Sequence, residues 1–204
     1  ALAAAFWASS VYAETGASSS SGDFYNLSLA ELGQVEISIA TGNSTPLDRA
    51  PATATVISAS EIQAMGARNL NEVLETVPGL HVSLSSLSRL DSVYSIRGIH
   101  TGFNPQVLLM LNGIPVQSSL QGGRPSLFRL PVSSIARVEV IRGPGATLWG
   151  SNAVNGVINI ISRLASDTQG TLVSAGAGGE DRVLVGRHGR TTEAGTSYRA
   201  WAKR

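Results

Sequence analysis

The chain has 204 residues, of which 43% are hydrophobic, and a mean hydropathy of +0.12. This is enough for one domain of roughly 100–150 residues with appendages. Fifteen Lys and Arg residues balance fourteen Asp and Glu, and no block of like charge occurs, which excludes the electrostatic pattern of a nucleic-acid-binding protein. The absence of cysteine excludes a disulfide framework and a thiolate metal site. The three histidines are far apart, without a carboxylate at ligand spacing, so no metal or catalytic site is predicted.

The amino-terminal residues read as an export signal followed by a linker. Residues 1–13 are small and apolar, and Val11 and Ala13 occupy the −3 and −1 positions of a cleavage site, as at the end of a secretory signal peptide. The run is too short to cross a bilayer as a helix. A disordered chain end is the alternative. Residues 14–45 form a flexible segment, rich in Ser and Gly at its start.

Residues 34–41 within this segment have the alternation of a strand, with Val35, Ile37 and Ile39 on one face. A Gly, Asn, Ser and Thr break follows, and no strand partner is evident nearby. An unpaired strand can accept a strand of another protein through backbone hydrogen bonds. The alternative is an ordinary first strand of the globular domain.

Two short helices are predicted after a β-rich run at residues 51–58. Ser60 is the expected N-cap of the first helix, which Gly66 ends. Asn69 is the expected N-cap of the second, with Glu72 three residues later and Pro78-Gly79 at its end.

Two Ile-Arg-Gly corners, at residues 96–98 and 141–143, each close a predicted strand. We expect their guanidinium groups, on Arg97 and Arg142, to lie at equivalent ends of one small sheet. If these groups are buried, each requires a carboxylate, because an unpaired buried charge costs several kcal/mol. Two surface arginines are the alternative.

Strands and turns complete the middle of the chain. Strands are expected at residues 80–84, 91–97 and 107–111. Asn112-Gly113 predicts a type I′ hairpin turn after the last of them. Residues 117–130 have little periodicity and predict a loop, and residues 131–135 a helical turn.

Residues 136–163 predict a strand, a tight glycine loop and a second strand. A dinucleotide loop would need Gly or Ala where Leu148 stands, and no helix pattern follows. A Walker loop would need Lys after Gly150, where Ser151 stands. A nucleotide-dependent enzyme is therefore a weak alternative, which nucleotide binding by the isolated chain would support.

The same stretch resembles the plug domain of TonB-dependent outer-membrane receptors, whose signature ends in E-V-I-R-G-P, L-Y-G and G-G-V-I-N-I. The matching residues here are 139–144, 148–150 and 155–160, with Trp149 in place of Tyr and Asn155 in place of Gly. The resemblance extends over most of residues 46–163. It implies an α+β plug domain, made of a small mixed β-sheet with short helices, followed by the first antiparallel strands of a transmembrane β-barrel.

Residues 164–204 change character, in agreement with the barrel strands that the resemblance implies. They alternate weakly between small or apolar and polar residues, as in residues 171–177, 182–187 and 198–203. This period of two is typical of membrane barrel strands with apolar side chains outward and polar ones inward. Two strands of a solvent-exposed sheet are the alternative.

The resemblance also implies site residues. The TonB box, which pairs with a strand of TonB, is placed at Glu36, Ile37, Ser38, Ile39, Ala40 and Thr41. Arg97 and Arg142 are implied to face glutamates on barrel strands. We expect the apical loops at residues 85–91, 100–105 and 117–124 to meet the substrate. Their nominated contact residues are Ser88, Arg89, His100, Phe103, Gln121 and Arg124.

The implied function is active uptake of a scarce, large solute across the outer membrane of a Gram-negative cell, with the box facing the periplasm. The substrate would be a ferric siderophore, haem, cobalamin or a similar solute. The partners would be TonB, this small-molecule or metal-chelate substrate and the lipid around the barrel, with no nucleic acid. Neither a catalysed reaction nor a cofactor is implied. The alternative function is a soluble periplasmic binding or signal-sensing domain.

Overall fold

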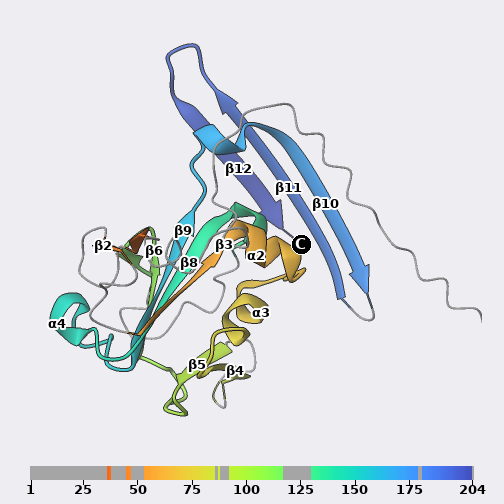
Figure 1. The fold of residues 1–204 in the computed structure, drawn as a ribbon. Helices are drawn as coiled ribbons and strands as arrows, with labels where there is room; N and C mark the ends of the chain where they lie inside the picture. The colour runs from red at the N-terminus through yellow and green to blue at the C-terminus, as the bar shows by residue number, and fades with distance from the viewer. Residues whose placement is uncertain are drawn as a thin grey trace, which may run out of the picture. The chain divides into compact units, whose positions relative to one another are not determined.

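The computed structural model of the chain describes residues 36–37, 45–46, 53–85, 87, 92–116, 130–178 and 181–203 (Figure 1). The chain divides into two compact units. One is Ser20–Ser162, and the described part of the other lies within Arg163–Arg204. Among the described residues, no helix is long and apolar enough to cross a membrane. The same residues contain no cluster of three or more His, Cys, Asp or Glu side chains suited to a metal ion.

A five-stranded mixed sheet forms the centre of the first unit. β6 and β9 are parallel, and the other neighbouring pairs are antiparallel. The order across the sheet is β3 (Ala54–Ser58), β8 (Ile135–Arg142), β9 (Gly156–Ser162), β6 (Val107–Leu111) and β7 (Ile114–Pro115). The central strands are buried on both faces, which explains their nearly continuous runs of Val, Ile and Leu.

Each face of this sheet has its own hydrophobic cluster. On one face Val138, Val140 and Ile158 pack with residues of two helices, α2 (Ala59–Ala64) and α3 (Leu70–Glu75), which follow one another beside the sheet (Figure 1). The opposite face carries a smaller cluster of Leu108, Met110, Ile141, Ala153 and Val157, against which Trp149 packs.

The helix caps confirm one prediction and correct another. Asn69 caps α3, and its Oδ1 accepts the Glu72 amide at 3.1 Å. The expected cap Ser60 is wrong, because α2 begins one residue before it and Ser58 is the cap. Ser58 and Glu61 form a reciprocal capping box, in which the Ser58 amide donates to the Glu61 carboxylate at 2.6 Å.

The strands predicted at residues 80–84, 91–97 and 107–111 are present in the first unit. β4 (Leu80–Leu84) and β5 (Ser92–Ile96) form a separate two-stranded antiparallel sheet. Asn112 and Gly113 join β6 to β7 with φ values of 51° and 78°, which confirms the predicted turn. A 3₁₀ turn, η3 (Val132–Ser134), stands where a helical turn was expected. In the glycine loop, however, where no helix pattern was recognised, a single helical turn forms, α4 (Ala146–Trp149).

The predicted box strand has a partner in its own neighbourhood, contrary to expectation. β1 (Glu36–Ile37) pairs antiparallel with β2 (Thr45–Pro46). The two pieces are close in sequence, so a simple chain reversal brings them together, and alternation alone does not show this. Ser38, Ile39, Ala40 and Thr41 lie outside the described residues.

The second unit is a three-stranded antiparallel sheet that follows a 3₁₀ turn, η4 (Ser166–Thr168). Its strands are β10 (Gly170–Gly178), β11 (Asp181–Thr191) and β12 (Ser197–Lys203). The strand register places Val173, Ala175, Leu184, Tyr198 and Ala200 on one face, and all five are exposed.

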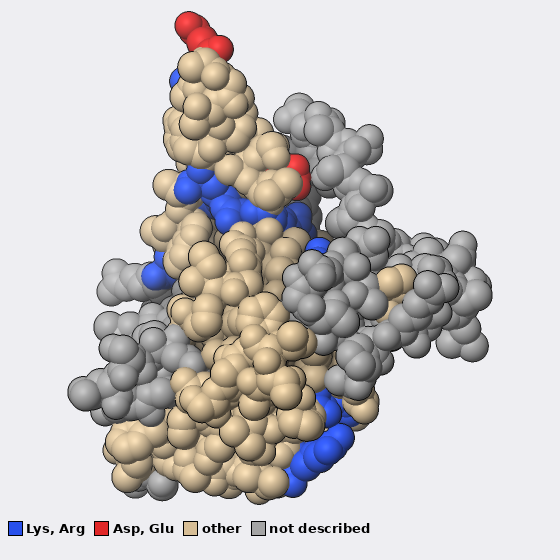
Figure 2. Space-filling view, turned by 90° about the vertical axis from the view of Figure 1, so that its left-hand side faces the viewer, with Lys and Arg blue, Asp and Glu red and all other residues tan. Residues whose placement is uncertain are grey.

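On the molecular face that Figure 2 shows, the charged side chains are mainly Lys and Arg, which gather in a few areas among uncharged residues.

Candidate functional site

The Arg97 and Arg142 corners meet at one end of the first unit. The Arg97 Nη2 donates to the main-chain oxygen of Arg142 at 3.2 Å. Arg142 in turn donates to the Pro78 carbonyl and, at 3.2 Å, to the Thr55 hydroxyl. The main chain supports this geometry, since the Arg97 amide donates to the Gly79 carbonyl at 2.9 Å. The two arginines therefore join β3, β5, β8 and the turn before β4.

The relation between these corners differs from the prediction. Arg97 follows β5 in the two-stranded sheet and Arg142 ends β8 in the five-stranded sheet, so they do not terminate one sheet. Side-chain hydrogen bonds between the sheets bring them together, which a repeated local motif does not reveal. Within the described ranges, both guanidinium groups bond only to neutral oxygens. The Arg142 Nε is also buried with no hydrogen-bond partner in that part of the chain. The corner thus carries two positive charges without a carboxylate from the described residues.

Gly156 allows the strands at this corner to approach closely. It lies opposite Arg142 in the register of β8 and β9. A Cβ at this position would lie 2.4 Å from the Ile141 carbonyl oxygen and 2.5 Å from the Ile96 Cδ1. A side chain is therefore excluded by packing rather than by backbone conformation.

The described residues of two predicted substrate-facing loops are joined by a hydrogen bond. The Ser85 hydroxyl donates to the Gly102 carbonyl at 2.7 Å, which joins the loop after β4 to the loop after β5. Buried Asn104 fixes the second loop, because its Nδ2 donates to the Tyr94 carbonyl at 2.9 Å. His100 and Phe103 are both exposed there. The other nominated residues, Ser88, Arg89, Gln121 and Arg124, lie outside the described residues.

A buried carboxylate was not recognised from the sequence. Glu139 is only 1% exposed, in the middle of β8, and accepts from the Arg137 Nε at 2.9 Å. It lies opposite Asn159, whose Oδ1 accepts the Gly113 amide at 3.0 Å. The alternation of residues 138–141 puts Glu139 on the face opposite Val138 and Val140, and the burial of Glu139 shows that this face is also covered. A charged residue inside an otherwise apolar run was the available signal.

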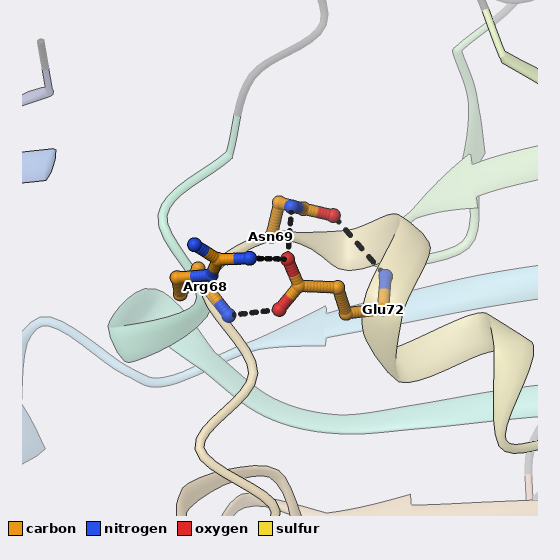
Figure 3. A network of polar contacts seen from close by, with 3 residues as sticks. All are labelled: Arg68, Asn69 and Glu72. Atoms are coloured by element: carbon orange, nitrogen blue, oxygen red, sulfur yellow. Dashed lines mark hydrogen bonds and ion pairs between the residues drawn. The ribbon is translucent and has the colours of Figure 1, made fainter. Parts of the chain in front are cut away.

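Two carboxylates, Glu72 and Glu75, accept hydrogen bonds at the two ends of α3. Glu72 accepts from the Arg68 amide at 2.8 Å, the Asn69 side chain at 2.8 Å and the Arg68 guanidinium at 3.2 Å (Figure 3). At the other end of α3, the Val82 amide and then the His81 ring hold the pKa of the Glu75 carboxyl below its usual value. Both carboxylates are accounted for by local structure, so neither marks a reactive site.

Comparison with known proteins then decides the family. The family model "TonB-dependent Receptor Plug Domain" matches residues 46–157. The chain belongs to this family of receptors. The match contains both arginine corners and the described residues of two loops that are predicted to face the substrate, and it begins at Pro46, the last residue of β2.

Two relatives are vitamin B12 transporters. The chain is 41% identical over 135 residues to the vitamin B12 transporter BtuB of Vibrio vulnificus, an alignment that covers 66% of this chain and 22% of the relative. It is 31% identical over 153 residues to BtuB of Photobacterium profundum, covering 74% and 24%. The chain therefore spans about a quarter of the length of these relatives.

Solved structures show the same fold. The ferripyoverdine receptor of the outer membrane of Pseudomonas aeruginosa is 24% identical and has a TM-score of 0.64, over 83% of this chain and 22% of that receptor. The α+β plug with the antiparallel strands that follow it is thereby confirmed as the fold class.

Proposed function

We propose that this chain is the plug and first barrel strands of an outer-membrane receptor that takes up a scarce, large solute using energy supplied through TonB. The plug-family match over residues 46–157 is the observation that carries the proposal. The 41%-identical relative is a vitamin B12 transporter, so cobalamin is the first substrate to test, with ferric siderophores second.

The proposed TonB contact is the box at residues 36–41. Among the described residues, the pairs that join β1 to β2 are Glu36 with Pro46 and Ile37 with Thr45. Pro46 has no amide hydrogen to donate, which further limits the strength of this pairing. A strand of TonB could replace β2 at small cost, because both partners offer the same type of backbone hydrogen bond. We propose that the paired and released forms of β1 are the two states of the receptor's coupling element.

The proposed substrate contacts lie in the loops at residues 85–91, 100–105 and 117–124. The Ser85–Gly102 hydrogen bond supports a shared surface for the first two loops. Substrate bound there would favour release of the box only if it binds the two states with different affinity. The contact residues proposed are Ser88, Arg89, His100, Phe103, Gln121 and Arg124.

Arg97 and Arg142 are proposed to face carboxylates on the barrel wall. Arg97 is exposed and Arg142 is half-buried, and among the described residues their guanidinium groups bond only to neutral oxygens, so both charges are available to acidic partners on the barrel wall. Such pairs would hold the plug in the barrel at rest.

The second unit supports the membrane part of the proposal. Val173, Leu184 and Tyr198, on one face of the strands, are 70%, 52% and 44% exposed. A water-soluble sensing domain would leave these three side chains in water, whereas barrel strands place them against lipid. The division of the chain at Ser162 supports a plug boundary near residue 163, with barrel strands in 164–204. The segments before the plug are proposed as a signal tail at 1–13 and a flexible lead at 14–45.

Uptake in cells tests this function. The complete receptor that contains this chain would be expressed in Gram-negative cells lacking their own cobalamin receptor, and labelled cobalamin and ferric siderophores would be offered in turn. We expect accumulation of one of them that disappears when TonB is deleted. Equal accumulation without TonB, or none from the whole panel, would refute the proposal.

A further inference from the structure

The segment that follows β9, residues 163–169, contacts Gly189 and Arg199 on one face of the three-stranded sheet. These two residues lie directly opposite each other in the register of β11 and β12, so they share one face. The Arg199 Nη1 donates to the Arg163 carbonyl at 2.9 Å. Arg199, a residue of β12, thereby fixes the main chain at Arg163.

Gly189 provides the space for the next contact. A Cβ at this position would lie 2.3 Å from the Thr168 carbonyl oxygen, 3.2 Å from the Thr168 carbonyl carbon and 3.4 Å from the Gln169 Cα. All three are main-chain atoms, so the contact could be relieved only by moving the chain. Gly189 is not among the glycines with positive φ, so close approach is what requires glycine here.

The segment in contact with Gly189 is itself a closed turn. Thr168 is 1% exposed, and its hydroxyl donates to the Leu164 carbonyl at 3.0 Å. The amides of Asp167 and Thr168 donate to the carbonyls of Leu164 and Ala165 at 3.2 and 3.3 Å. The strands therefore hold an ordered turn.

The residue just before this segment is tied within the first unit. The Ser162 amide donates to the Asn112 Oδ1 at 2.8 Å, and the Asn112 Nδ2 donates to the Ser162 hydroxyl at 3.0 Å. The Asn112 amide also bonds to the Ile160 carbonyl at 2.8 Å. Two consecutive residues, Ser162 and Arg163, are thus each fastened within their own unit.

We propose that Gly189 and Arg199 form a seat that anchors the carboxyl end of the plug to the first barrel strands while TonB pulls on its amino end. This inference rests on the proposed function. A pull on one end moves a body as a whole unless its other end is held. With Arg163 to Thr168 held, the load falls across the plug itself, which would unfold locally instead of leaving the barrel. Arg199 acts as a positioning residue for the chain at Arg163.

The first test measures the seat without TonB or substrate. In the purified complete receptor, Gly189→Ala should speed hydrogen exchange at the Asp167 and Thr168 amides by about tenfold, because the turn must move. Gly186→Ala in the same strand and Gly176→Ala on the same face are matched controls, since nothing lies within 4 Å of a Cβ at either position. Equal exchange in Gly189→Ala and the controls would overturn the seat.

The second test measures its mechanical role. Arg199→Gln should increase entry of a large antibiotic through the receptor several-fold in cells with TonB and leave it unchanged in cells without TonB. Arg199→Lys, which can still donate to the Arg163 carbonyl, should restore the barrier. Ser174→Ala, at an exposed position on the same face as Arg199, is the control.

The combined outcomes separate the two proposals. Faster exchange together with TonB-dependent leakage supports the anchor. Faster exchange with leakage that ignores TonB refutes its mechanical role. If the unaltered receptor takes up nothing, the proposed function fails, while the exchange contrast still decides whether the seat exists.

Discussion

The two units of this chain bury apolar side chains in different ways. In the first unit Val138 and Val157 are both 0% exposed, on opposite faces of a sheet that is covered on both sides. In the second unit Val173 and Leu184 are 70% and 52% exposed. The first unit carries its own core, whereas the strands of the second present apolar side chains that its described residues do not cover. This difference is what a plug followed by membrane strands requires.

The largest effect is expected from charge on the apolar face of the second unit. Ala175→Arg should lower the stability of the assembled receptor by about 2–4 kcal/mol if the site lies near the bilayer centre. Ser174→Arg, one residue earlier and on the opposite face, should be tolerated. Membrane-inserted receptor would be measured by its resistance to unfolding by urea. Equal loss from both substitutions would contradict the assignment of a lipid face.

A somewhat smaller effect is expected inside the first unit. Gly156→Ala places a methyl group 2.4 Å from the Ile141 carbonyl oxygen and should destabilise the plug by about 1–3 kcal/mol. Gly145→Ala should cost less, because its nearest neighbour, at 2.9 Å, is a Val157 methyl group that can move. Hydrogen exchange of the β8 and β9 amides measures both. The reverse order would show that this corner is less tightly packed than the structure indicates.

The arginine corner should give an intermediate effect. Arg142→Ala removes hydrogen bonds to the Pro78 carbonyl and the Thr55 hydroxyl, a loss of about 1.5 kcal/mol. If Arg97 and Arg142 also pair with the barrel, replacing either by Ala should increase antibiotic leakage through the receptor. Arg68→Ala, an exposed helix-end arginine, is the control. Unchanged permeability would count against pairing with the barrel.

The smallest of these effects is expected at the start of α3. Asn69→Ala removes the N-cap side chain of α3, which accepts a hydrogen bond from the Glu72 amide. It should reduce the free energy of unfolding of the plug by about 1 kcal/mol (Figure 3). Asn69→Ser keeps a capping oxygen and should recover most of the loss. A chemical denaturation series on the complete receptor measures both, and an unaffected Asn69→Ala variant would show that tertiary packing alone holds the helix.

The features that were predictable from the sequence are those fixed by a few neighbouring residues. The turn at Asn112-Gly113 is predictable because Asn and Gly tolerate the positive φ that both positions adopt. The cap at Asn69 is predictable from its spacing to Glu72. Strand positions followed from alternation and from apolar runs, and the glycine loop carried the family resemblance. Each of these depends on local chemistry, which a sequence displays directly.

The features that were missed depend on contacts between distant segments. The Ile-Arg-Gly corners lie in different sheets, and Arg97 reaches Arg142 across 45 residues of sequence. The burial of Glu139 depends on what covers the second face of the sheet, which its own strand does not reveal. The cap at Ser58 was missed for a different reason: Ser58 and Ser60 each have Glu or Gln three residues later, and the choice between them depends on where the strand before the helix ends.

The central claim is that TonB acts on this plug through the backbone of residues 36–41. Ile37→Pro removes an amide donor from the box, and Ile37→Ala changes the side chain while keeping that donor. Energised uptake of the substrate, measured beside its equilibrium binding to the same cells, tests the claim directly. We predict that Ile37→Pro abolishes uptake but binds substrate normally, and that Ile37→Ala retains both. Normal uptake by Ile37→Pro would contradict the account.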